Sequence, residues 1–301
     1  MSQKKKNIIS TIIFSIIVIA GLSLLLYPTI SDWWNKHTQS QTIKTYLDNV
    51  ETMDTKDYEA ELQKAREYNE KLYKTEGALY YPDRVEGYQD ILNINGNGIM
   101  GYVSIPKIKL KLPIHHGTDE ATLVSSVGHL WGSSVPIGGV NTHAVIAAHR
   151  GSPSARLFTD IDKLDYGDRF TITIFNDVYI YEVDQIVTIS PEECKYFEIE
   201  EGKDLVTLQT CTPYGINSHR LLVRGKRVGT TTVDDDEYNV DYNVVDALTT
   251  GPNLWVFLGI GVFAAFMVTV FLIRRKRDKK ENKKLEENTS DNDMKRNGEN
   301  E

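Results

Sequence analysis

The sequence has no excess of positive charge and very little cysteine. Its 34 Lys and Arg residues are outnumbered by 42 Asp and Glu residues, which gives a formal net charge of −8. This balance argues against a nucleic-acid partner, because binding to phosphates needs a basic patch on the folded surface. The two cysteines, Cys194 and Cys211, are too few for a disulfide framework, although they leave a single bridge between them open.

Metal ligands and sequence repeats are scarce as well. His115 and His116 are adjacent, but no third ligand at zinc-like spacing accompanies them, so we expect a structural role for both. No acidic loop demands calcium. The sequence therefore predicts no metal and no cofactor. No repeat of about 20–50 residues is visible, which argues against a repeat architecture.

Two long apolar runs stand out against this polar background. They extend from Ile8 to Ile30 and from Leu254 to Ile273, and neither contains a charged residue. About 20 such residues in a helix cross the hydrocarbon core of a bilayer, so both runs are long enough to span a membrane. The first could instead be a cleaved signal peptide, but its apolar part is too long and no A-x-A-like cleavage site follows.

The charges beside these runs predict their orientation. Lys4–Lys6 precede the first run, and six Lys and Arg residues lie between 274 and 280 after the second. Because positive residues stay on the cytoplasmic side, we expect both termini inside and residues from about 31 to 251 outside. Trp33 and Trp34 follow the first run directly, as residues that anchor a helix at the membrane interface do.

Between the two runs the sequence changes from a helical to a β pattern. Apolar residues recur at helical spacing from about Gln41 to Lys74, which predicts two helices joined near Asp54–Lys56. From about Met100 to Val228, short alternating or β-branched segments lie between turn signals, which predicts an all-β barrel or sandwich. The expected strands are Gly101–Ile105, Ala144–Ala148, Arg169–Phe175, Val178–Ile189, Leu205–Thr210 and Arg220–Val228.

Three residues that suit nucleophilic catalysis stand at the ends of expected strands. Cys211 follows one strand directly, on its more polar face, and Pro213 prevents the ladder from continuing. Arg220 starts the next strand after a short turn, so a hairpin would bring it near Cys211. His149 closes an earlier strand. A thiolate can attack a carbonyl, an imidazole can move the proton, and a guanidinium can stabilise the oxyanion.

The residue pattern alone leaves alternatives open. A cysteine on a strand is more often a small core residue than a nucleophile. Spacing does not choose the histidine partner either, whereas alternation points His219 to the face opposite Arg220. The other histidines that spacing allows are His115, His116, His129 and His143.

Longer segments resemble a known family. TLQTCTPYGINSHRLLVRGKR at 207–227 resembles the cysteine-bearing strand, the turn and the arginine-bearing strand of sortases, and THAVIAAHRG at 142–151 is similar to their histidine-bearing strand. Segments at 98–118, 127–139 and 157–170 resemble the class C subgroup, which polymerises pilins. The resemblance covers about Gly98 to Arg227, and the two predicted membrane spans agree with that subgroup.

This resemblance implies a mainly β fold, an eight-stranded barrel with N-terminal helices and two transmembrane helices. It implies that Cys211 is the nucleophile, His149 the acid/base and Arg220 the anion stabiliser. The expected reaction cleaves an LPxTG-like signal between Thr and Gly and transfers the acyl group to a pilin lysine. Its partners are pilins or surface proteins with C-terminal sorting signals, and the lipid membrane. The alternatives are a housekeeping sortase that uses a cell-wall precursor and a non-catalytic pilus assembly module.

The resemblance is broken at one point. Class C sortases usually carry a lid loop with an Asp-Pro-aromatic triplet, whereas the acid and the aromatic are exchanged here. We expect residues 77–87 still to form a lid, with one tyrosine near Cys211 and the aspartate free to pair with Arg220. The alternative is an ordinary surface loop. The candidate lid residues are Tyr80, Tyr81, Pro82 and Asp83.

The expected organisation follows the chain in seven parts. Cys194 lies in an acidic stretch of the expected catalytic barrel and is expected to be an exposed free thiol. The parts are a cytoplasmic N-terminus (1–7), a transmembrane anchor (8–30), an extracytoplasmic helical segment with the lid loop (31–97), the catalytic barrel (98–229), a linker (230–253), a second transmembrane helix (254–273) and a disordered cytoplasmic tail (274–301).

Overall fold

The computed structural model describes residues 3–94, 96–152, 155–233, 259 and 261. The predicted second membrane helix and the cytoplasmic tail therefore lie outside the described residues, apart from two isolated positions. Residues 1–242 form one unit, which contains all the named helices and strands.

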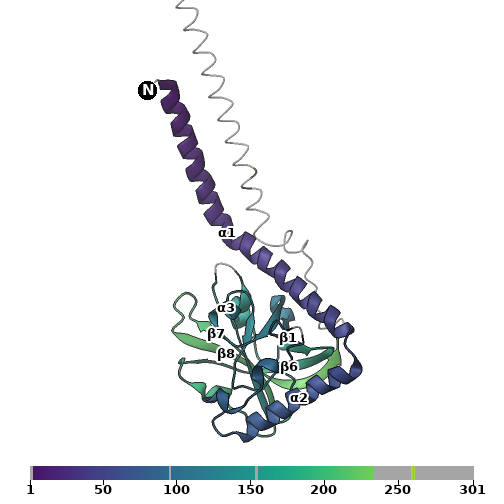
Figure 1. Ribbon diagram of the computed structural model, residues 1–301. Coiled ribbons are helices and arrows are strands. Elements are labelled where there is room, and N and C mark those ends of the chain that lie inside the picture. The colour runs from purple at the N-terminus through teal and green to yellow at the C-terminus, as the bar shows by residue number, and fades with distance from the viewer. Residues whose placement is uncertain (1–2, 95, 153–154, 234–258, 260, 262–301) are drawn as a thin grey trace, which may run out of the picture. The chain divides into compact units, whose positions relative to one another are not determined.

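The N-terminal helix α1 (Gln3–Glu51) is continuous over 49 residues (Figure 1). It contains both the predicted membrane anchor and the first predicted helix of the extracytoplasmic segment. The helix therefore continues without interruption across the expected boundary between residues 30 and 31. Its Ile13–Glu51 part is long and apolar enough to cross a membrane, and none of its most apolar stretch is buried in the protein. It is the one helix of this kind in the described part of the chain.

The second half of α1 and the helix α2 (Thr55–Lys74) pack on the rest of the unit. Tyr46 of α1 is buried, and its hydroxyl donates to Met100 O at 3.1 Å. Asp54 caps α2 by accepting a hydrogen bond from Lys56 N at 3.0 Å. The predicted pair of helices joined near residues 54–56 is confirmed, since α1 ends at Glu51 and α2 begins at Thr55.

Eight strands form a closed barrel in the order β1-β2-β3-β4-β7-β8-β6-β5 (Figure 1). Two neighbouring pairs, β2/β3 and β4/β7, are parallel, and the other pairs are antiparallel. This arrangement confirms the expected eight-stranded barrel. The strands are β1 (Ile99–Ile105), β2 (Leu110–His116), β3 (Val127–His129), β4 (Thr142–Ala147), β5 (Arg169–Ile174), β6 (Asp177–Ile189), β7 (Asp204–Thr212) and β8 (His219–Thr232).

Short helical turns lie between α2 and β1 and in the connections between the strands. They are η1 (Pro82–Arg84), η2 (Tyr88–Asp90), η3 (Pro106–Ile108), α3 (Glu120–Leu123), η4 (Leu157–Lys163) and η5 (Cys194–Phe197).

Two strands and one boundary differ from the sequence prediction. β2 was not predicted because Pro113 lies within it and proline argues against a strand, although Leu110, Leu112 and Ile114 alternate with other residues. β3 has three residues, which is too short to give a periodic signal. β8 continues to Thr232, past the expected end of the barrel at 229.

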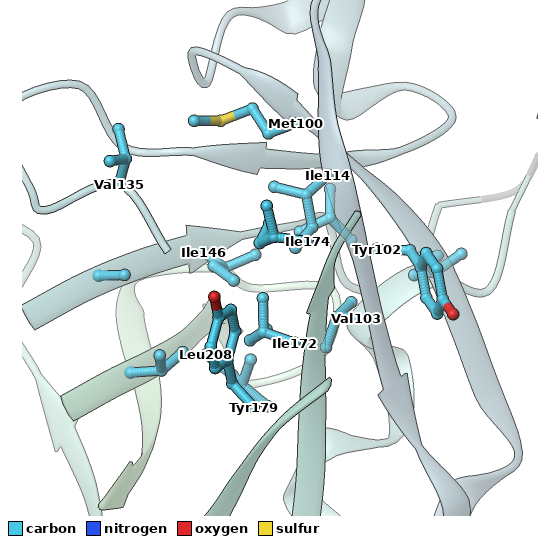
Figure 2. Close-up of a cluster of buried hydrophobic side chains, with 14 of the residues drawn as sticks. Met100, Tyr102, Val103, Ile114, Val135, Ile146, Ile172, Ile174, Tyr179 and Leu208 are labelled. Atoms are coloured by element: carbon cyan, nitrogen blue, oxygen red, sulfur yellow. The ribbon is translucent and has the colours of Figure 1, made fainter. Parts of the chain in front are cut away.

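The interior of the barrel is filled by apolar side chains from alternate positions of the strands. Figure 2 shows Ile114, Ile146 and Ile172, from β2, β4 and β5, converging there, and all three are fully buried. A second cluster, called the outer cluster, consists of Val145, Ile189, Phe197 and Leu222. Since Val145 follows Ala144 and precedes Ile146, it belongs to the opposite face of β4 from the interior.

Candidate active site

Cys211 and Arg220 are direct partners across two antiparallel strands. Cys211 is the penultimate residue of β7, and the register pairs it with Arg220 of β8. Directly opposed residues of antiparallel strands point to the same face, with Cβ atoms about 4.5–5.5 Å apart. Cys211 is partly buried and its thiol is free. The hairpin predicted from the turn therefore brings these two residues together.

His149 lies at the same level on the other side of Cys211. β4 runs parallel to β7, and the register pairs Ala147 with Gln209. The contact continues past the strand end, because Ala148 N donates to Gln209 O at 3.1 Å and Thr210 Oγ1 donates to Ala148 O at 2.8 Å. Continued by two residues, this register places His149 at the level of Cys211. The three residues thus form a row at the ends of β4, β7 and β8, on the face that also carries the outer cluster.

The other histidines do not join this row. His129 and His143 are buried and hydrogen-bonded, to Ser134 O at 2.7 Å and to Thr207 Oγ1 at 2.8 Å respectively. Burial lowers the pKa of each to about 4. His116 is buried and bonded to backbone carbonyls. These surroundings are those of structural histidines.

Glu120 is a neighbour of His149 that no sequence motif indicated. Its Oε1 lies 3.5 Å from His149 Nε2, and its side chain is 82% exposed. It is the first residue of α3, which Asp119 caps by accepting from Thr122 N at 3.0 Å. A carboxylate at this position favours one orientation of the imidazole.

Arg150 ties the end of β4 to the end of β7. Its side chain is only 10% exposed and forms an ion pair with Asp162. Its Nη1 also donates to Thr212 Oγ1 at 3.3 Å, and its guanidinium lies 6.0 Å from the ring of Tyr214. The residue after His149 is therefore attached to the residue after Cys211, an arrangement that the sequence did not reveal.

Arg220 is held by its own turn. Its Nη1 donates to Asn217 O and His219 O, each at 3.1 Å. No ion pair links Arg220 to Asp83, or to another carboxylate, in the described part of the chain, so the expected Asp83–Arg220 contact is not formed in this structure. A guanidinium carries five N–H donors, which leaves this one able to bind an oxyanion in addition to the turn.

The candidate lid lies over the outer cluster. Leu79 packs against this cluster, and the hydroxyl of Tyr80 donates to Glu198 Oε1 at 3.1 Å. Leu222 of the cluster pairs with Gln209, which is two residues, or about 7 Å, from Cys211 along β7. The segment therefore runs beside the row on the same face of the sheet.

Most of the candidate lid residues are exposed. Tyr80 and Tyr81 are 53% and 56% exposed, and the guanidinium of Arg84 lies 4.4 Å from the Tyr81 ring. Pro82 opens η1 and lies against Gly132, where an added Cβ would come 3.2 Å from the proline.

Cys194 differs from its expectation in exposure. It is free, as expected, but it is partly buried and packs against the outer cluster. Within the described ranges, no group of three or more His, Cys, Asp and Glu residues has the arrangement of a metal site.

A thiol with an imidazole and a guanidinium on its two sides, at the end of a barrel strand, has the groups that cysteine acyl transfer requires. A family model for the sortase domain matches residues 103–228. Sortase C1 from Streptococcus agalactiae is 50% identical over 63% of this chain and 98% of that chain, with a TM-score of 0.59. The chain therefore belongs to the sortase family, whose members are cysteine transpeptidases.

Two further solved structures are class C sortases as well. Sortase C from Streptococcus pneumoniae is 40% identical, with a TM-score of 0.58, over 65% of this chain and all of that chain. Sortase C from Clostridium perfringens, in a structure with the C-terminal cell wall sorting motif, is 40% identical, with a TM-score of 0.56, over 63% of this chain and 99% of that chain.

Proposed function

We propose that this sortase is a membrane-anchored class C enzyme that joins pilin subunits through their sorting signals, with Cys211, His149 and Arg220 as its catalytic residues. The observation that supports these roles most directly is the pairing of Cys211 with Arg220 in the antiparallel register, together with the parallel register of β4 and β7, which places His149 at the level of Cys211 when it is continued by two residues.

In the first half-reaction, the Cys211 thiolate attacks the carbonyl carbon of the Thr–Gly bond of the sorting signal. Arg220 donates hydrogen bonds to the oxyanion that forms. The imidazolium of His149 gives its proton to the leaving glycine amine, so that the C–N bond breaks and a thioester remains.

In the second half-reaction, a lysine amine of another pilin attacks the thioester. His149 takes a proton from this amine, and the C–S bond breaks as an isopeptide bond forms. The products are the joined subunits and the free Cys211 thiolate, which can start a new cycle.

The choice of substrate is supported by the class C neighbours. The Clostridium perfringens structure carries the C-terminal cell wall sorting motif, and the Streptococcus pneumoniae structure concerns pilin substrate specificity. We infer that this chain acts on an LPxTG-like signal and a pilin lysine. The second candidate is a housekeeping reaction that uses the amine of a cell-wall precursor, and the third is a non-catalytic assembly module.

The exposed apolar part of α1 supports anchoring in a membrane. We propose that residues 8–30 and 254–273 cross it, that the barrel lies outside a Gram-positive type of cell, and that both termini lie inside. Protease protection of tags at the two termini, measured in intact spheroplasts, tests this topology. Digestion of either tag without lysis would contradict it.

The two acceptors can be separated by competition. The full chain is incubated with an LPxTG peptide and equal amounts of a lysine-bearing pilin and a wall-precursor pentaglycine. We expect the isopeptide product to dominate. Dominant transfer to pentaglycine would favour the housekeeping reaction, and no product with either acceptor would favour the non-catalytic module.

A further inference from the structure

We propose that the active-site end of the barrel rests on the membrane surface, with Tyr214 and Ile216 of the β7–β8 turn entering the lipid headgroup layer. The inference rests on the proposed anchoring by α1. It identifies the partner of the turn as a bilayer interface, next to the row of Cys211 and its neighbours.

The first observation is a contact between the anchor helix and the loop after His149. Asp32 Oδ1 accepts a hydrogen bond from Arg156 N at 2.9 Å, and the same carboxylate pairs with Lys36 Nζ at 2.8 Å. Arg156 immediately precedes η4, in the connection that begins at His149. The residue that precedes η4 is therefore attached to α1 at Asp32.

Asp32 lies very close to the expected end of the hydrocarbon core. It is two residues beyond Ile30, the last residue of the apolar run, which corresponds to about 3 Å along a helix. The headgroup layer on each side of a bilayer is about 5–7 Å thick. Any group bonded to Asp32 is then within this layer, and a tilt of the helix brings it closer still.

The β7–β8 turn lies next to this connection. Thr159 N donates to Arg156 O at 2.9 Å, and Gly151 N donates to Thr159 Oγ1 at 3.1 Å. The ring of Tyr214 covers Gly151, where an added Cβ would come 2.9 Å from it. These hydrogen bonds and this packing lead from Asp32 through Arg156, Thr159 and Gly151 to Tyr214.

The turn has the composition of an interfacial segment. Residues 213–218 contain no charged residue, and Tyr214 and Ile216 are 61% and 72% exposed. Amphipathic aromatic side chains such as Tyr favour the membrane interface, and an exposed Ile costs free energy in water but not among acyl chains. On a surface that faced only water, these two exposed side chains would have no apolar surroundings to contact.

Contact with the bilayer would also suit the reaction. A sorting signal whose protein is still held in the membrane reaches Cys211 with little extension if the site opens at headgroup level. Restricting enzyme and substrate to one surface raises their effective concentration. A substrate protein that binds Tyr214 and Ile216 directly is the alternative occupant, and the tests below separate it from lipid.

The depth of the turn can be measured with a fluorescent probe. The full chain with Cys194→Ala and Cys211→Ala is reconstituted in vesicles of phosphatidylcholine and phosphatidylglycerol, and an NBD group is attached at Ile216→Cys. Val140→Cys is the matched control, because Val140 is 71% exposed but precedes the first residue of β4. The length of the strand puts Val140 about 25 Å from the end of β4 that leads to His149.

We expect a blue-shifted emission from the probe at 216, and quenching by shallow spin-labelled lipids, while the probe at 140 shows neither. Equal quenching at both positions would overturn the proposal.

A second variant tests whether insertion of the β7–β8 turn into the bilayer affects the rate of the reaction. Ile216→Asp places a negative charge at an anionic surface, so transfer from a vesicle-tethered substrate should fall about fivefold, while cleavage of a soluble peptide stays within about twofold of the parent. An equal loss with both substrates would mean that the turn binds substrate rather than lipid. Lack of peptide cleavage by the parent would instead refute the proposed function and leave the probe result standing.

Discussion

Replacing Arg150 tests whether the tie between β4 and β7 keeps the row aligned. In Arg150→Gln, the ion pair with Asp162 and the hydrogen bond to Thr212 are lost, together with the packing under Tyr214. A hydrogen bond to a charged group contributes about 1.5–3 kcal/mol, and a neutral-acceptor bond at 3.3 Å contributes less. Arg150 Nε is buried without a hydrogen-bond partner, and the free-energy cost of this burial offsets part of the stabilisation that the side chain provides. We expect a net loss of about 2 kcal/mol in the free energy of unfolding.

The same variant should affect the chemical step more than binding. A displacement of about 1 Å between reacting groups can lower a rate about 100-fold. We therefore expect kcat for peptide cleavage to fall about 10- to 100-fold while KM changes little, because Arg150 holds the residues beside it and is not required to contact the peptide.

Urea unfolding and steady-state cleavage of a soluble peptide measure these two effects. Arg66→Gln is the matched control, since Arg66 is exposed on α2, and it should change stability by less than about 0.5 kcal/mol. If Arg150→Gln unfolds at the parent's urea midpoint and keeps its kcat, the tie does not maintain the site. A rise in KM at constant kcat would show instead that Arg150 acts in substrate binding.

Three further predictions follow from the contacts beside the row. Burial holds the pKa of His143 at about 4 against about 6.5 when unfolded, so the unfolded chain binds more protons and stability should fall as pH drops from about 6.5 towards 4, by up to about 1.4 kcal/mol per pH unit. His129, whose pKa is also about 4, contributes a similar slope, so urea midpoints should fall across this range and His143→Gln should reduce the slope by about half; an equal slope in the variant would contradict the assignment. Leu79→Ser should loosen the candidate lid and speed thiol labelling of Cys211, measured in a Cys194→Ala background, and unchanged labelling would count against a lid. Glu120→Gln should lower the peptide cleavage rate about two- to fivefold, as expected for an exposed side chain that orients His149, whereas an unchanged rate would show that the carboxylate does not influence His149.

Local sequence signals predicted the part of the site that a single hairpin builds. The strand before Cys211, the proline after it and the start of a strand at Arg220 were enough to expect the two residues side by side, and β7 and β8 pair them directly. Alternation also showed which face of β7 the thiol occupies. Such predictions succeed because the two strands are close in sequence and their register depends on one turn.

The position of His149 could not be predicted in this way. β4 and β7 are parallel neighbours that lie about 60 residues apart in the chain, so their register is set by the packing of the whole barrel. The same holds for Arg150 and Glu120, whose partners come from distant segments. Resemblance to a family selected His149, and the alignment of Ala147 with Gln209 is the geometric reason that this histidine stands beside the thiol.

The fold was predictable where its elements are long and regular. The helix pair and the β5–β6 hairpin gave clear periodic signals, whereas the proline inside β2 argued against a strand and the three-residue β3 is too short to give such a signal. The continuity of α1 was also not evident, because the apolar run and the amphipathic segment have different patterns although one helix contains both.

The most direct test of the account is the intact mass of the full chain after incubation with an LPxTG-like peptide. We predict an increase that equals the acyl part of the peptide, located on Cys211 by fragmentation and released by hydroxylamine as expected for a thioester. The adduct should persist in Cys194→Ala and disappear in Cys211→Ala, and it should form much more slowly in His149→Ala and Arg220→Ala. An adduct on Cys194, or one that survives in Cys211→Ala, would contradict the assignment of the nucleophile.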